Sequence, residues 1–178
     1  MTALLVALGG LVAFAAVLLV AGATSPRRHL STVELSLPRP PEEVWAVVSK
    51  LEDWPSWNAA VSSMKLLGEH DGKPRWEQGW GRERMCIDVL EHTAPTRLVT
   101  RIVDDGLPFG GTWTWALTAE PGGTRVSVVE DGEVRSVLFR GMARLFFGHT
   151  GTQQRALTGL ARRFGVDARL SMNVTFPR

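Results

Sequence analysis

The chain opens with an uninterrupted apolar run, from Ala3 to Ala23, that contains no charged or strongly polar side chain. At about 1.5 Å per residue this run forms a helix of roughly 31 Å, which matches the hydrocarbon core of a bilayer at about 30 Å. The run therefore predicts a transmembrane anchor over residues 1–24, followed by a short linker over residues 25–30.

A cleaved secretory signal is the competing interpretation of the same run, because residues 21–23 (AGA) have the small-x-small pattern of a cleavage site. Signal peptides usually begin with basic residues and have an apolar run of about 7–15 residues. No Lys or Arg precedes this run, so the anchor is favoured over export after cleavage near Ala23. Arg27 and Arg28 are the first basic residues, and the positive-inside tendency then predicts a cytoplasmic domain on the cell membrane.

The pattern after the linker changes to short periodic segments. Val33, Leu35 and Leu37 alternate with polar residues, which is typical of a half-buried strand. Residues 40–51 begin with two prolines and two glutamates and continue with apolar residues at helical spacing, so they predict an amphipathic helix. Residues 53–58 predict a second, short and irregular helix.

Six further segments favour strands and are joined by short turns, an arrangement typical of an antiparallel meander. They are residues 61–67, 73–78, 84–91, 98–103, 110–118 and 124–134. Residues 135–164 then predict one long amphipathic helix, in which Gly148 and Gly151 cost about 1 kcal/mol each relative to alanine and predict a bend. Four arginines share the face opposite the apolar stripe, either in solvent or against anionic lipid: Arg140, Arg144, Arg155 and Arg162.

Composition narrows the function classes. The 178 residues carry a formal net charge of +2, which lacks the electrostatic footprint of a nucleic-acid-binding protein. Cys86 is the only cysteine, so no intrachain disulfide and no cysteine metal site can form. The four histidines lack ligand spacing, and no phosphate-binding or hydrolase motif is present, so neither a metal nor a cofactor is expected. The sequence leaves the oligomeric state open.

Four short segments, together with the order of the predicted elements, resemble a known family. They are residues 41–45 (PEEVW), 54–57 (WPSW), 106–115 (GLPFGGTWTW) and 130–134 (EDGEV). The chain resembles the START / Bet v 1-like superfamily, often described as polyketide cyclase/dehydrase and lipid transport (SRPBCC). The resemblance covers residues 31–165 and leaves a tail at residues 166–178. It implies an α+β helix-grip fold, with an antiparallel sheet wrapped around a long C-terminal helix and an apolar cavity between them.

The resemblance and the residue pattern together give candidate side chains for a ligand cavity. They are Trp57, Trp76, Gln78, Met85, Ile87, Trp113, Trp115, Met142, Phe146, His149 and Gln153. Plain core packing is the alternative for the tryptophans, and a hydrogen bond to a backbone carbonyl is the alternative for His149. Glu130 and His149 are weak candidates for a catalytic acid–base pair, although Glu130 could instead pair with Arg101 or Arg125 on the surface.

Three functions are consistent with these observations. The first is a membrane-anchored binding protein for a hydrophobic small molecule or lipid. The second is a cyclase, dehydratase or hydrolase acting on a polyketide-like substrate, and the third is a structural or stress-related protein with a collapsed cavity. Because no catalytic motif is present, the sequence favours binding over catalysis and leaves enzymatic activity open.

Overall fold

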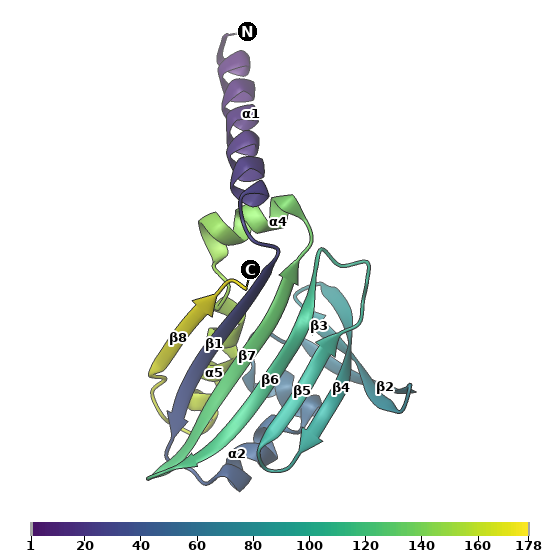
Figure 1. Cartoon of the computed structure of the whole chain (residues 1–178), viewed down its shortest axis with the longest axis vertical. Helices are drawn as coiled ribbons and strands as arrows, with labels where there is room; N and C mark the ends of the chain where they lie inside the picture. Colours follow the sequence, from purple (N-terminus) through teal and green to yellow (C-terminus); the bar gives the residue numbers. More distant parts are fainter. Residues whose placement is uncertain (1, 178) are drawn as a thin grey trace.

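The computed structural model describes residues 2–177, without the side chains of residues 4 and 147. The long helix α1 (Thr2–Ala23) projects away from a curved sheet (Figure 1). The shorter helix α4 (Val137–Met142) crosses the C-terminal end of α1. The apolar stretch Leu5–Ala23 of α1 is long enough to cross a membrane.

Eight strands form one sheet in which every neighbouring pair is antiparallel. The strands are β1 (Arg28–Leu37), β2 (Ser63–His70), β3 (Lys73–Trp80), β4 (Glu83–Thr93), β5 (Arg97–Ile102), β6 (Phe109–Glu120), β7 (Gly123–Val134) and β8 (Leu170–Thr175). Their order in the sheet is β2-β3-β4-β5-β6-β7-β1-β8. The six-stranded meander is confirmed, and β1 extends it by pairing with β7.

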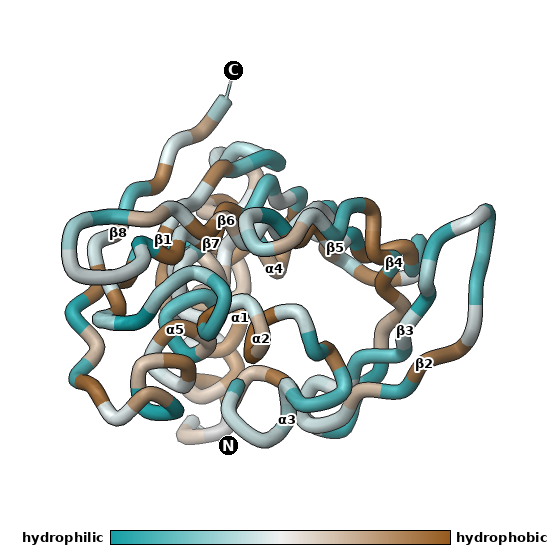
Figure 2. The backbone as a smooth tube through the Cα atoms, turned by 90° about the horizontal axis from the view of Figure 1, so that it is seen from below, coloured by the Kyte–Doolittle hydropathy of each residue, from teal (hydrophilic) through white to brown (hydrophobic). Residues whose placement is uncertain are grey.

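The core lies on the face of the sheet that the alternating pattern makes apolar. Val33 and Leu35 of β1 and Val126 and Val128 of β7 are buried on this face. Helix α5 (Gly151–Arg163) packs against them through buried residues such as Leu157. Seen from below, α5 and the short helices α2 (Pro41–Val48) and α3 (Trp54–Trp57) lie along this same side of the sheet (Figure 2). A single-turn helix η1 (Leu51–Asp53) joins α2 to α3.

The prediction of one continuous helix over residues 135–164 is wrong. The segment divides into α4, the π-helical turn η2 (Ala143–Phe147) and α5. Gly148 has a φ of +64°, a left-handed conformation that suits glycine and ends the first helix. The four arginines therefore do not share one solvated face, and Arg140 is buried beside α1.

The tail after residue 165 contains one further strand. Strand β8 pairs with the outer side of β1, with Leu170 opposite Leu35. The predicted strand at residues 33–37 also begins earlier, at Arg28, so β1 continues almost directly from the segment that follows α1.

Candidate functional site

A cavity of about 640 Å³ lies between the sheet and the helices. Its volume falls in the range of pockets that hold one small organic ligand. Strands β3 to β7 supply one wall, and α3, α4 and the start of α5 supply the other. Most of the wall is apolar: Trp54, Val61, Met85, Ile87, Ile102, Phe109, Trp113, Phe139 and Met142. Contact with such a surface favours a hydrophobic ligand, at about 25 cal/mol per Å² of apolar area buried.

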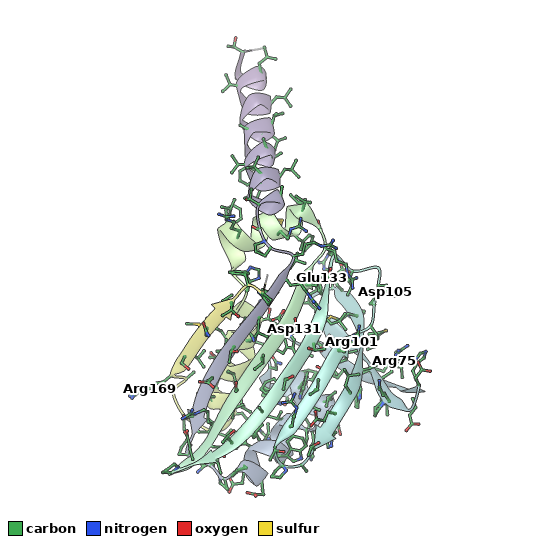
Figure 3. All side chains as sticks on the ribbon, in the orientation of Figure 1. Arg75, Arg101, Asp105, Asp131, Glu133 and Arg169 are labelled. Atoms are coloured by element: carbon green, nitrogen blue, oxygen red, sulfur yellow. The ribbon has the colours of Figure 1, made fainter. Side chains whose placement is uncertain are left out.

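One region of the cavity wall is polar. His29, Glu130 and His149 all line it, and the His29 Nε2 atom lies 3.4 Å from a carboxylate oxygen of Glu130. The rings of His29 and His149 lie against each other at a tilt of 39°, with their centroids 4.2 Å apart. Glu133 also lines the cavity and lies at the end of the sheet below α1 (Figure 3). The arrangement places two imidazoles and a carboxylate within reach of a polar group on a bound ligand.

The position of His29 depends on the neighbouring strand β7. His29 lies opposite Gly132 in the β1–β7 register, and a Cβ atom at Gly132 would fall against the imidazole. Gly132 therefore leaves the space that the ring occupies. His29 itself is buried, so its polar atoms need partners within the protein, and Glu130 supplies one.

Burial lowers the pKa of His149 below its usual value of 6.5, and the neighbouring imidazole of His29 lowers it further. Both effects disfavour a positive charge on His149. The neutral ring offers one hydrogen-bond donor and one acceptor near neutral pH, which suits either a hydrogen bond to a ligand or the role of a general base.

Lining residues that remain exposed mark the mouth of the cavity. Trp80 is 42% exposed and packs edge-to-face against Phe109, with 5.5 Å between ring centroids. Phe139 of α4 is 36% exposed, and Gly148 and Arg155 are exposed as well. The mouth is therefore bordered by the β3–β4 turn and by the α4-to-α5 segment.

About half of the side chains that the sequence predicted as ligand contacts line the cavity in the structure. Six of them line the cavity: Gln78, Met85, Ile87, Trp113, Met142 and His149. Glu130 lines it as well, but its partner is His29, whereas Arg125 pairs with Glu120 at 3.1 Å. His149 and Glu130 are thus linked through a residue that the sequence analysis did not select.

The other five predicted ligand contacts lie outside the cavity wall. Trp57 and Trp115 are buried in the core beside Trp54, and Trp76 packs against the edge of that core. Phe146 is 58% exposed and contacts Phe14 of α1.

Gln153 also lies outside the cavity wall. It is buried in the core, accepts a hydrogen bond from the Ser31 hydroxyl at 3.0 Å and donates to the carbonyls of Ser31 and Val128 at 3.1 and 2.9 Å. Its amide therefore ties α5 to the sheet.

Sequence reasoning missed His29, although a signal for it exists. The alternation that marks Val33, Leu35 and Leu37 as buried continues backwards through Ser31 to His29. Both of these residues are buried in the structure. Among residues 2–177, no group of three or more His, Cys, Asp or Glu side chains is placed to hold a metal ion.

The sequence profile of a family described as polyketide cyclase / dehydrase and lipid transport matches residues 28–165. No curated protein matches the chain. Several solved structures are similar in fold. A protein from Thermus thermophilus superposes with a TM-score of 0.59 and 21% identity, covering 76% of this chain and 96% of that one.

Two further solved structures are similar to this chain at lower identity. A START superfamily protein from Mycobacterium smegmatis gives a TM-score of 0.57 at 17% identity, over 76% of this chain and 98% of that one. The di-domain ARO/CYC StfQ from the steffimycin biosynthetic pathway gives a TM-score of 0.59 at 11% identity, over 78% of this chain and 53% of that one. At these identities the likeness shows the helix-grip fold.

Proposed function

Because the chain belongs to the polyketide cyclase/dehydrase and lipid transport family, we propose that it is a membrane-anchored protein that binds a hydrophobic small molecule or lipid. The observation that carries this proposal is the cavity of about 640 Å³, with its largely apolar wall and its His29–Glu130–His149 cluster. An amphiphilic ligand fits such a lining, because its apolar part can be buried while its polar group meets hydrogen-bonding partners.

The anchor in this proposal is α1, and a contact with the folded domain supports its retention. Arg140 donates a hydrogen bond from Nε to the carbonyl of Gly22 at 2.9 Å. Cleavage near Ala23 would remove this partner and leave a buried guanidinium without it. With Arg27 and Arg28 just beyond α1, the proposed location of the domain is the cytoplasmic side of the membrane.

The ligand can be identified by extracting the purified full chain with organic solvent and analysing the extract by mass spectrometry. Met85→Trp adds bulk inside the cavity, whereas Arg84→Trp adds the same side chain at the exposed neighbouring position on β4. We expect one amphiphile at close to one molecule per chain in the unmodified protein and in Arg84→Trp, and much less in Met85→Trp. Equal amounts in both variants, with both folded, would place the lipid outside the cavity.

A second candidate function, a cyclase or dehydratase acting on a polyketide-like substrate, is favoured by the His29–Glu130–His149 cluster. Dehydration removes a proton next to a carbonyl and releases hydroxide as water, so it needs a base and an acid within reach of the substrate. Glu130→Gln and His149→Asn should then each slow turnover of a β-hydroxy ketone about 10²-fold or more while the cavity still binds it. Unchanged rates in both variants would exclude this role. A collapsed interior, the third possibility, disagrees with the open cavity.

A further inference from the structure

Helix α1 packs closely against α4, the helix that follows β7. At their crossing a Cβ atom on Gly22 would fall against the carbonyl of Val137, and one on Gly141 would fall against the carbonyl of Leu18. Two glycines therefore allow the backbones of α1 and α4 to touch. In Figure 1, α4 lies across the base of α1 rather than alongside it.

A buried arginine fixes this crossing. The Arg140 guanidinium donates to the carbonyl of Gly22 at the end of α1 and to the carbonyls of Val134 and Arg135 at 3.1 and 2.9 Å. The last carbonyls of a helix lack partners within it, and a positive charge is favourable at that end. The junction is thus a built contact between a buried cation and main-chain acceptors, with Arg144 adding a hydrogen bond to Thr24 at 3.2 Å.

The turn η2 reaches further along α1. The ring of Phe146 lies 6.2 Å from the ring of Phe14, centroid to centroid. Phe14 precedes Gly22 by eight residues, which is about 12 Å along a helix. Phe146 is therefore beside a part of α1 that a membrane-spanning helix would hold among lipid acyl chains.

The α4–η2 segment, residues 137–147, carries an apolar outer face as well. Five of its large apolar side chains are at least 36% exposed: Val137, Leu138, Phe139, Leu145 and Phe146. Phe139, together with Met142 and Ala143, also lines the cavity. The segment is thus the wall that separates the cavity from the zone around α1.

We infer that the α4–η2 segment is a second membrane-contacting element, embedded in the leaflet that surrounds the C-terminal end of α1. This inference rests on the proposed function, because it requires α1 to span the bilayer. Burying exposed leucine, valine and phenylalanine side chains in lipid is favourable, and the exposed Arg144 within the segment can reach the headgroup region with its long side chain. The cavity mouth at Phe139 then faces lipid, and the ligand it admits is a membrane-derived amphiphile.

The test uses the full chain in phospholipid vesicles whose acyl chains are brominated at mid-length. A Cys86→Ser background removes the only cysteine, and a bimane label is attached at Leu138→Cys, Leu145→Cys, Val12→Cys in α1 or Ser171→Cys in β8. Bromine quenches the label on contact. We expect quenching at positions 138 and 145 to approach that at position 12, and Ser171→Cys to keep its emission.

The outcomes separate the two claims. Quenching at position 12, with positions 138 and 145 behaving like position 171, would overturn the inference while leaving the anchor in place. Absence of quenching at position 12 would remove the membrane anchor, and both claims with it. Because Leu138 and Leu145 are both exposed, the two variants are expected to fold normally, and a thermal unfolding curve for each checks this.

Discussion

Gln153 shows how one polar side chain can be structural even where the sequence suggests a ligand contact. Helical periodicity correctly placed it on the buried face of α5. Its partner Ser31, however, is 122 residues away in the sequence and comes close where α5 packs against β1. The pattern of a single helix therefore identified the burial of Gln153 but not its hydrogen bonds.

Replacing Gln153 with leucine should lower the free energy of unfolding by about 2–4 kcal/mol, because buried groups of Ser31 and Val128 lose their partners. Gln154→Leu is the matched control, since this neighbouring amide donates to the hydroxyl of Thr150, the residue that precedes α5, and not to the sheet. Urea unfolding of the full chain measures both variants. Equal, small losses in the two variants would show that the Gln153 network contributes little.

The lowered pKa of His149 predicts how stability changes with pH. The unfolded chain binds a proton on this residue near pH 6.5, whereas the folded chain binds it only at lower pH. The unfolded state therefore holds more protons below pH 6.5, and the folded protein loses stability as the pH falls from there towards the lowered pKa. Thermal unfolding at pH 7.5 and 5.5 should show a smaller difference in His149→Gln than in the unmodified chain.

Thr152→Ala provides the comparison for that experiment, because Thr152 also lines the cavity at the start of α5 but carries no titratable group. It should leave the pH dependence unchanged. A His149→Gln protein with the same pH dependence as the unmodified chain would contradict the assignment of this effect to the buried ring.

At the scale of elements, the strands were easier to predict than the helices that cover them. Alternation is a local property, so the six-stranded meander follows from the residues and their turns. The break between η2 and α5 depends on Gly148 in a left-handed conformation and on contacts that α4 makes with α1. The apolar stripe along residues 135–164 carries no information about the contact between α4 and α1. The sequence pattern therefore predicted a bend rather than two separate helices.

The α1–α4 junction should be broken by a side chain at Gly141. Gly141→Leu places bulk against the carbonyl of Leu18 and should separate the two backbones, whereas Gly10→Leu adds the same bulk where nothing lies within 4 Å. A disulfide between Phe14→Cys and Phe146→Cys, in the Cys86→Ser background, reports the contact. We expect rapid cross-linking with Gly10→Leu and severalfold slower cross-linking with Gly141→Leu; similar rates would show that the glycine contact does not hold the junction.

At the scale of the molecule, the family resemblance gave the helix-grip fold, and the structure and the family profile confirm it. Residues 170–175 lacked a predicted element, because an edge strand such as β8 is defined by its pairing with β1. The placement of the cavity beside α1 was equally hidden from the sequence. It arises from contacts between segments more than 100 residues apart, such as Arg140 with Gly22.

The central claim, a cavity that holds a hydrophobic molecule beside the membrane, can be tested through the tryptophans. Trp54, Trp80 and Trp113 line the cavity, whereas α1 and the α4–η2 segment contain no tryptophan. A brominated fatty acid added to the full chain in vesicles therefore quenches tryptophan emission to saturation when it enters the cavity, whereas fatty acid that only surrounds α1 or touches Trp80 at the mouth quenches without saturating. We expect quenching that saturates at one fatty acid per chain; emission that is unchanged, or that falls without saturating, would contradict the presence of a ligand-holding cavity.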